Sequence, residues 1–256
     1  RASGATIVGN YVGALDASGS ATSLAIANRD GGIVVYGTDV TVGGTTAADR
    51  NVVAGNGTVQ IVIAAGAHRA LVQGNHVGTD LSGTVDVDGA AVVGLTSAGI
   101  SVDQADGVVI GGSQPGAGNL VSGNGGFGIA LSTGTLNARV QGNLIGTDIT
   151  GTVAMGNAGG IVLWATTGGN LIGGSQPGEG NLISGNVDSG IYVGFAHVRE
   201  AIQGNRIGVS ADGMTALPNG NVGIIVEYGS NILIGTDADG DRDAEEGNQI
   251  VGGAGT

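Results

Sequence analysis

Short apolar segments alternate with Gly and Asn along the whole chain, and this alternation is the main signal in the sequence. Within each segment the apolar residues fall at every second position, as in strands with one buried face. The clearest examples are residues 33–35, 61–63, 100–102, 129–131, 161–163, 191–193 and 224–226. Gly and Asn interrupt the chain too often for long helices to form. The pattern therefore predicts an all-β protein built from many short strands.

Two motifs recur and define a long internal repeat. In the first motif, Gly-Asn follows an apolar residue and then Val or Gln, and it precedes a variable residue, then Val or Ile and Gly. Its Asn residues step by 65, 68 and 62 positions: Asn10, Asn75, Asn143 and Asn205. The second motif spans residues 109–124 and recurs almost unchanged over 171–186, with more divergent copies over 41–56 and 233–250. A period of this length indicates a solenoid or a related repeat architecture.

Comparison of the copies separates surface positions from core positions. The position after the first-motif Asn varies in a way that only solvent tolerates, so we expect these residues outside: Tyr11, His76, Leu144 and Arg206. The equivalent set in the second motif is Val52, Leu120, Leu182 and Gln249. The residue after each of these is aliphatic and is expected to point inward: Val12, Val77, Ile145, Ile207, Val53, Val121, Ile183 and Ile250.

Gly and Asn are expected at the corners between strands. Both residue types tolerate left-handed backbone conformations, which sharp corners require. Asn side chains that recur in register can also bond to the neighbouring repeat. The spacing leaves open whether one repeat contains two or three coils.

The repeat resembles that of bacterial extracellular right-handed parallel β-helix proteins, which include surface and adhesin-like proteins. The segments that carry the resemblance are residues 142–148, 151–152, 173–178 and 181–186, and the likeness covers nearly the whole chain. It implies a right-handed parallel β-helix, a solenoid of superrepeats 62–68 residues long that forms one domain over residues 1–256. It also implies a position outside a bacterial cell, in the extracellular space or at the cell surface. The same fold occurs in polysaccharide lyases and pectinases.

Composition supports this class and excludes several partners. Hydrophobic residues make up 41% of the chain but aromatic residues only 3%, which suits a narrow aliphatic interior. The net charge is -13 and every basic residue is Arg, so we expect no nucleic-acid partner. No apolar run is long enough for a membrane span. Since the chain opens at Arg1, we expect a mature segment of a longer repeat protein.

An acidic stretch in the last repeat is the sharpest candidate for ligand chemistry. Alternate carboxylates surround Gly240, and such an arrangement can converge oxygen ligands on a hard cation. We therefore predict calcium as a cofactor, with these ligands: Asp237, Asp239, Asp241, Asp243 and Glu245. The spacing differs from that of an EF-hand, and the alternative is a solvated acidic turn.

A second group of candidates lies in loops that follow the first motif. Asp80 and Asp148 occupy equivalent Gly-Thr-Asp positions, on loops expected at one edge of each repeat. Such edges are where solenoids usually bind partners. The favoured alternative is that both aspartates cap their own turns by accepting backbone N–H bonds.

Candidate catalytic groups are scarce. His68 with Arg69, and His197 with Arg199 and Glu200, are the tight clusters of His and charge, and they lie too far apart for one active site. The Gly-His-Gly segment of pectin hydrolases of this fold is absent, and so is the Lys that related lyases use. The aromatic residues that sugar rings would contact are few and fit ordinary packing equally well: Trp164, Tyr192 and Tyr228.

These observations favour a non-catalytic extracellular segment with a structural or adhesive role. We expect calcium to stabilise it, copies to associate end to end, and polysaccharide or another cell-surface molecule to be its partner. The alternative is a carbohydrate-active β-helix, which would be a lyase, a hydrolase or a binding module. Ice binding is disfavoured because the Thr residues gather in loops rather than on a flat face.

Overall fold

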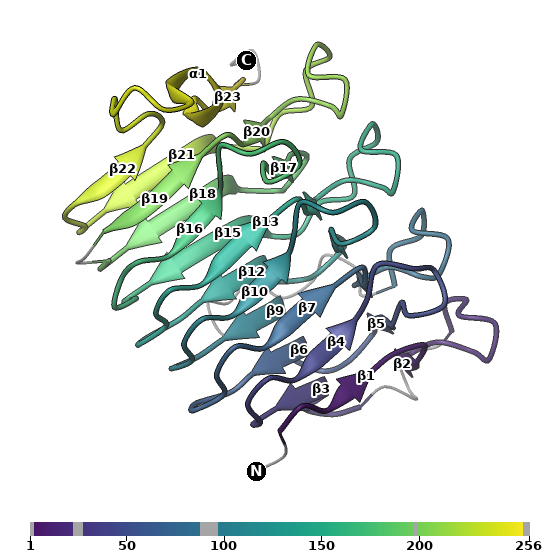
Figure 1. The fold of residues 1–256 in the computed structure, drawn as a ribbon. Coiled ribbons are helices and arrows are strands. Elements are labelled where there is room, and N and C mark those ends of the chain that lie inside the picture. The colour runs from purple at the N-terminus through teal and green to yellow at the C-terminus, as the bar shows by residue number, and fades with distance from the viewer. Residues whose placement is uncertain (1–2, 23–27, 88–96, 197–198, 253–256) are drawn as a thin grey trace.

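The computed structural model describes residues 3–22, 28–87, 97–196 and 199–252, and these residues are almost entirely β-structure. Their strands form three parallel sheets, which the chain visits in turn (Figure 1). We call one passage through the three sheets a coil. The single described helix, α1 (Asp243–Glu246), lies in the last coil. This arrangement confirms the all-β prediction and is consistent with a parallel β-helix.

Each coil adds one short strand to each sheet. The first sheet contains β1 (Thr6–Ile7), β4 (Thr41–Gly43), β7 (Leu71–Gln73), β10 (Val109–Gly111), β13 (Arg139–Gln141), β16 (Leu171–Gly173), β19 (Glu200–Gln203) and β22 (Ile232–Ile234). The second contains β2 (Tyr11–Gly13), β5 (Val52–Ala54), β8 (His76–Val77), β11 (Leu120–Val121), β14 (Leu144–Ile145), β17 (Leu182–Ile183), β20 (Arg206–Ile207) and β23 (Gln249–Ile250). The third contains β3 (Gly31–Val35), β6 (Val59–Ile63), β9 (Ala98–Val102), β12 (Phe127–Leu131), β15 (Gly159–Trp164), β18 (Ser189–Gly194) and β21 (Val222–Glu227).

Aliphatic side chains stack in columns and fill the space between the sheets. Strand pairing places like residues over one another, as with Ile129, Ile161 and Ile191 in the third sheet. All but two of the residues predicted to point inward are fully buried: Val53, Val77, Val121, Ile145, Ile183 and Ile207. The exceptions lie in the terminal coils, where Val12 is half-buried and Ile250 is 48% exposed.

One superrepeat consists of two coils, a long one and a short one. Successive corner Asn residues are 41, 24, 44, 24, 38, 24 and 43 positions apart. Each long coil carries two insertions, whereas each short coil connects its strands directly. We call the insertions after the second sheet the hairpin loops; they span residues 13–22, 78–87, 146–155 and 208–217. We call those after the first sheet the corner loops; they span residues 44–50, 112–118, 174–180 and 235–247.

A ladder of Asn side chains joins the coils at the corner between the first and second sheets. In Asn143, for example, the backbone N–H and the Nδ2 group both donate to Oδ1 of Asn181 in the next coil, at 3.0 and 2.9 Å. The same Nδ2 group also donates to the Ile110 carbonyl of the preceding coil at 3.0 Å. The ladder contains Asn10, Asn51, Asn75, Asn119, Asn143, Asn181, Asn205 and Asn248. This confirms the predicted bonding between stacked Asn residues.

The predicted backbone conformation of these corner Asn residues is wrong. None of them has a positive φ; in the four copies of the first motif the left-handed residue is instead the Gly before the Asn, such as Gly142 with φ 66°. The reason is steric, since a Cβ on Gly142 would approach the Gly112 carbonyl oxygen of the adjacent coil to 2.4 Å. Gly therefore makes the sharp turn, and Asn is left free to bond.

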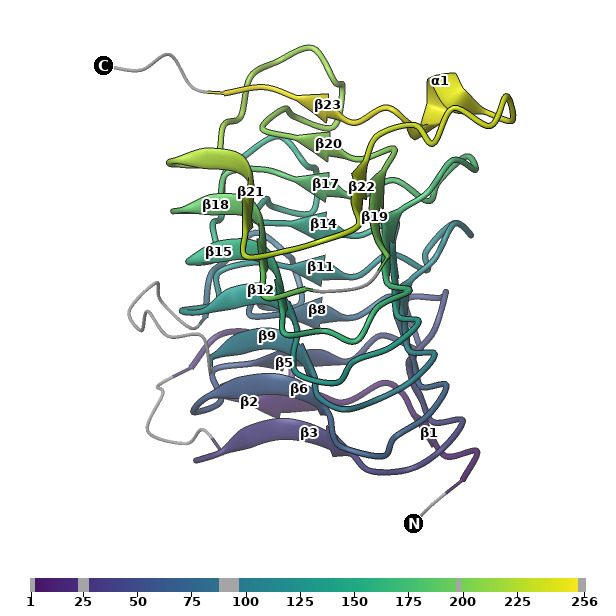
Figure 2. The same cartoon turned by 90° about the vertical axis from the view of Figure 1, so that its left-hand side faces the viewer.

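The coils are stacked along one axis (Figure 2), and the loops project at the side where β20, β17, β5 and β2 lie in Figure 1. In the described residues, no helix has the length and apolar character required to cross a membrane.

Candidate functional site

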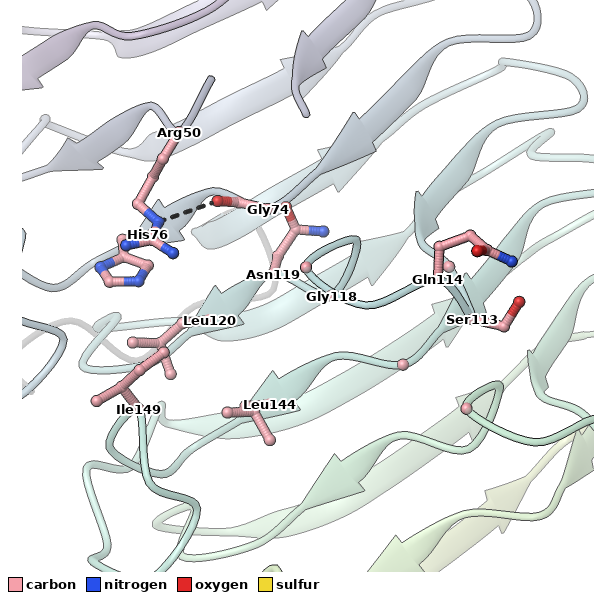
Figure 3. Close-up of a pocket in the computed structure, with 14 residues that line it drawn as sticks. Arg50, Gly74, His76, Ser113, Gln114, Gly118, Asn119, Leu120, Leu144 and Ile149 are labelled. Atoms are coloured by element: carbon pink, nitrogen blue, oxygen red, sulfur yellow. Dashed lines mark hydrogen bonds between the residues drawn. The ribbon is translucent and has the colours of Figure 1, made fainter. Parts of the chain in front are cut away.

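The outer face of the second sheet carries a groove between the hairpin loops and the corner loops. Two adjoining pockets of about 230 and 460 Å³ make up this groove, and both contact Leu144. The floor is apolar and is formed by Leu120, Leu144 and Leu182, which point away from the core. Figure 3 shows the first pocket, with Ser113 and Gln114 of a corner loop on one side and Ile149 of a hairpin loop on the other.

The loops that wall the groove are held in place by hydrogen bonds. The loops of each series bond to one another or to adjacent coils. In the hairpin series, the Ile149 N–H donates to the Gly83 carbonyl of the preceding loop at 3.0 Å. In the corner series, the Glu179 carbonyl accepts from the Gly142 N–H at 2.9 Å. Surface loops are usually mobile, and hydrogen bonds of this kind restrict the positions of these loops.

His76 is buried, so its prediction as a surface residue is wrong. The ring points away from the core but is only 2% exposed, because the hairpin loop of residues 78–87 folds over it. A Cβ on Gly83 of that loop would lie 3.1 Å from the ring. The same covering buries three other residues predicted outside: Val52, Leu120 and Leu182. Copy-to-copy variability identified the outward direction correctly, but not the loops that cover it.

The environment of His76 keeps its imidazole neutral. Burial, with a smaller contribution from the Arg50 guanidinium, lowers the pKa of His76 to about 4. Nδ1 lies 3.2 Å from the Asp80 carbonyl oxygen and acts as its donor, while Nε2 is buried without a hydrogen-bond partner among the described residues. A neutral imidazole cannot attract an anion, so His76 contributes shape to the groove rather than charge.

Charged groups lie at the two ends of the groove. Arg50 lies at one end and donates from Nε to the Gly74 carbonyl at 3.3 Å. Arg206 and Glu245 line the other end, where Arg206 donates to the Ala211 carbonyl at 2.9 Å. Glu245 is the only carboxylate among the described lining residues. Hydrolysis of a glycosidic bond generally uses a pair of carboxyl groups, of which the described lining offers one.

The acidic loop brings together only part of the predicted calcium set. One carboxylate oxygen from each of Asp237, Asp243 and Glu246 lies within 4.8 Å of the others. Asp239, Asp241 and Glu245 do not join them. Helix α1 explains the difference, since positions three apart share a face of a helix and Asp243 is therefore aligned with Glu246, not Glu245.

Hydrogen bonds hold these three carboxylates in the loop. Glu246 is only 7% exposed and accepts the Asp237 N–H at 3.0 Å. Asp243 accepts from the Thr236 hydroxyl at 2.9 Å. Sequence reasoning missed Glu246; a helical reading of residues 243–246 would have found it. Three carboxylates in this geometry suit a hard cation such as calcium.

Asp80 and Asp148 cap their hairpin loops, as the favoured interpretation held. Asp148 Oδ1 accepts the N–H groups of Thr152 and Val153, both at 3.1 Å. Partial burial pushes the pKa of Asp148 upward, but hydrogen bonds from Thr150, Val153 and Thr152 outweigh it and lower the pKa overall. Asp80 accepts the Gly83 N–H at 3.1 Å in the equivalent turn. Both aspartates are therefore occupied in stabilising their loops.

The described members of the two clusters of His and charge lie apart along the first sheet. Arg69 is engaged in an exposed ion pair with Asp39, at 2.7 Å. Arg199 has the same register four strands further along the first sheet, roughly 19 Å away at a strand spacing of about 4.8 Å. His197 lies outside the described residues. These positions confirm the expected separation of the two clusters.

Glu200 is a buried carboxylic acid, 1% exposed, at the start of β19. Its Oε1 accepts from the Thr166 hydroxyl at 2.7 Å and from Asn170 Nδ2 at 3.2 Å, whereas Oε2 has no partner among the described residues. Burial raises the pKa of Glu200 despite these bonds. In the described part of the chain, no second titratable group is hydrogen-bonded to it.

Comparison with known proteins gives no further guide: no family model, curated protein or solved structure matches the chain.

Proposed function

We propose that the chain is a non-catalytic structural and adhesive segment of a bacterial extracellular or cell-surface protein. Its coils would form a right-handed parallel β-helix, a solenoid that holds the two loop series at fixed spacing. The Asn ladder is the observation that carries this proposal, because it ties every coil to the next from Asn10 to Asn248. Repetition without a chemically distinct coil fits a scaffold better than an enzyme.

Resistance to proteolysis tests the structural role. A stacked frame with hydrogen-bonded loops should yield few cleavages when native protein is treated with a broad-specificity protease, and its fragments should end within residues 235–247 or at the termini. The last corner loop is the vulnerable one because residues 237–245 are largely exposed. Rapid cleavage throughout the coils would contradict a scaffold role.

The groove supports polysaccharide as the partner of the adhesive role. Leu144 is half-buried on the floor, and hydroxyl and amide groups line one wall, which suits a sugar chain because it presents both C–H faces and hydroxyls. The alternative, a carbohydrate-active enzyme, draws support from the same groove. A screen of acidic and neutral polysaccharides for new reducing ends or unsaturated products separates the two, because only the enzyme generates product.

Calcium is proposed as a stabilising ion of the acidic loop. The convergence of Asp237, Asp243 and Glu246 supports it, and extracellular calcium modules typically bind with Kd near 10⁻⁴–10⁻³ M. Millimolar calcium should then raise the melting temperature of the chain, and Asp243→Asn should remove the increase. Asp241→Asn is the matched control, since Asp241 is outside the cluster. An equal increase in both variants would contradict the site.

End-to-end association is proposed for the end of the stack at which the last described strands lie. In the last coil, inward-facing residues that are buried elsewhere are exposed: Val226 at 47%, Ile234 at 41% and Ile250 at 48%. Unpaired strand edges and apolar surface favour a further coil at this end. Multi-angle light scattering should show a mass that increases with concentration; a constant monomer mass would contradict the association.

A further inference from the structure

The aromatic residues of this chain lie outside its main core. The chain has one Trp, four Tyr and two Phe, and none of them belongs to the column of buried aliphatic residues. Four aromatic side chains instead gather where β15, β18 and β21 of the third sheet end. We call this group the aromatic platform; it consists of Trp164, Tyr192, Phe195 and Tyr228.

The rings of the platform are in mutual contact across three coils. Trp164 lies 6.1 Å from Tyr192 and 4.9 Å from Phe195, measured between ring centroids. Phe195 and Tyr228 follow at 5.0 Å with their planes 17° apart. Beneath the first two rings is Gly194, where a Cβ would lie 2.7 Å from the Tyr192 ring and 2.9 Å from the Trp164 ring. The absence of a side chain at Gly194 lets both rings lie against the backbone.

Two of the rings occupy backbone positions that are unfavourable for large side chains. Phe195 and Tyr228 have φ values of 54° and 55°, in the left-handed region, and are 39% and 67% exposed. The equivalent residue of the preceding coil is Ala165, with φ 53°. Ala is therefore sufficient for the turn, and the exposed rings need another explanation. Backbone strain and exposed apolar surface at one place are typical of binding sites.

A polar pair borders the platform. The Tyr192 hydroxyl donates to the Glu227 carboxylate, and this hydrogen bond raises the pKa of Tyr192 to about 12. The phenol therefore stays protonated, and the exposed carboxylate keeps acceptor positions for further hydroxyl donors. Flat rings beside a hydroxyl and a carboxylate match a pyranose, whose C–H faces stack on aromatic rings while its hydroxyls donate and accept hydrogen bonds.

We propose that the aromatic platform binds a neutral glycan chain. The net charge of -13 disfavours an anionic ligand near Glu227. A second copy of the chain is also a poor occupant, because an apolar contact would bury this carboxylate at a cost in desolvation. The hydroxyls of a sugar can instead donate hydrogen bonds to the carboxylate in place of the water that hydrates it. The inference rests on the adhesive role proposed above and assigns it a surface distinct from the groove.

Trp164 makes the test direct, because it is the only Trp in the chain and its emission reports on the platform alone. Cellohexaose and chitohexaose are the probes. We expect a saturable change of Trp emission with at least one probe. Phe195→Ala and Tyr228→Ala, which restore the residue type of Ala165, should weaken binding by roughly tenfold each, the equivalent of about 1.4 kcal/mol. Circular dichroism and melting temperature verify that both variants remain folded.

Tyr36→Ala is the matched control. Tyr36 is 58% exposed but follows β3, at the opposite edge of the third sheet from β21. Its replacement should leave probe affinity unchanged. The proposal fails if neither probe changes the emission, if Tyr228→Ala binds as tightly as the parent chain, or if the platform variants abolish a concentration-dependent dimer.

The platform and the adhesive role can fail separately. Retention of the chain on immobilised polysaccharide that is equal for the parent and Tyr228→Ala would refute the platform and leave adhesion through the groove in place. If neither the parent nor Tyr228→Ala is retained, both the platform and the adhesive role are refuted.

Discussion

Two corners of the same coils differ in what recurs from one coil to the next. At the corner between the first and second sheets, the same residue recurs in every coil, and the interior members of this Asn ladder are at most 1% exposed. At the corner between the third and first sheets, only the backbone conformation recurs. Every described residue there has a positive φ, but the side chains differ: Asp39, Arg69, Gly107, Asn137, Gly169, Arg199 and Asn231. We call this second set the variable corner.

The difference shows what fixes a residue in a repeated fold. A ladder Asn is buried and makes bonds to both adjacent coils, so no other side chain can replace it without leaving buried polar groups unpaired. At the variable corner the side chains are exposed apart from Gly107, which is half-buried. Identity is therefore fixed where the side chain bonds, and only φ is fixed where the side chain meets solvent.

Gly173→Val should have the largest effect, because it combines strain with a clash at the ladder corner. Gly173 has φ 90°, and a Cβ there would lie 1.9 Å from the Gln203 carbonyl oxygen. We expect a loss of roughly 3–5 kcal/mol in the free energy of unfolding, measured by urea denaturation. Gly235→Val is the matched control, since Gly235 is the equivalent residue of the last coil, has φ 97° and has no atom within 4 Å of its Cβ position. Equal losses would show that backbone strain, rather than the clash with the adjacent coil, causes the destabilisation.

Asn143→Ala should have the next largest effect. It removes the Nδ2 bond to Asn181 and the Oδ1 acceptor of Asn119, and it leaves the buried Ile110 carbonyl without its Nδ2 donor, so we expect roughly 2–4 kcal/mol of destabilisation. Asn137→Gly, at the variable corner, is the comparison: Asn137 is exposed, and Gly107 and Gly169 already occupy its position in adjacent coils. Thermal denaturation of both variants measures the contrast. A comparable loss for Asn137→Gly would overturn the distinction between the two corners.

Glu200→Gln should have a smaller and pH-dependent effect next to the variable corner. Burial raises the pKa of Glu200 in the folded chain, so the fold favours the protonated acid. Its contribution to stability is thus fully present below the unfolded pKa and is lost as pH rises through the folded pKa. Gln cannot ionise. Between acidic and neutral pH, the free energy of unfolding of the variant should therefore rise by on the order of 1 kcal/mol relative to that of the parent. Denaturation at pH 4 and pH 8 checks this; a pH-independent difference would contradict it.

Arg69→Ala should have the smallest effect. The Arg69 guanidinium bonds to Asp39 through both Nε and Nη2, and this hydrogen bonding lowers the pKa of Asp39. Both side chains are exposed, however, and solvent and salt screen such pairs. The melting temperature should change no more than the measurement error in 0.5 M NaCl. A clear loss there would mean that the variable corner depends on its side chains after all.

Much of the fold could be predicted from the sequence. Aliphatic positions such as Val77 and Ile145 repeat in register, and they are fully buried as expected. The corner Asn residues were found by the same comparison, and their bonds between coils were expected. The left-handed conformation at Arg69 and Arg199 could not be predicted, because Arg is not a residue type that favours it. Their shared register was the available hint.

The candidate sites were less predictable. His76 was assigned to the surface because its equivalents are Tyr11, Leu144 and Arg206, yet a hairpin loop covers it. Of five predicted calcium ligands, two lie together, and Glu246 joins them because one helical turn rotates Glu245 away. In both cases the outcome depends on how a loop folds against its neighbours.

The sequence by itself determined the strands, the order of inward and outward positions and the corners where coils bond. It could do so because each coil contacts mainly the next, and a pattern that repeats in the chain repeats in space. Only the tertiary structure decided that two coils form one repeat, which outward residues the loops bury, and which acidic and aromatic side chains meet. Those contacts join residues that share no period, so no repetition in the chain records them.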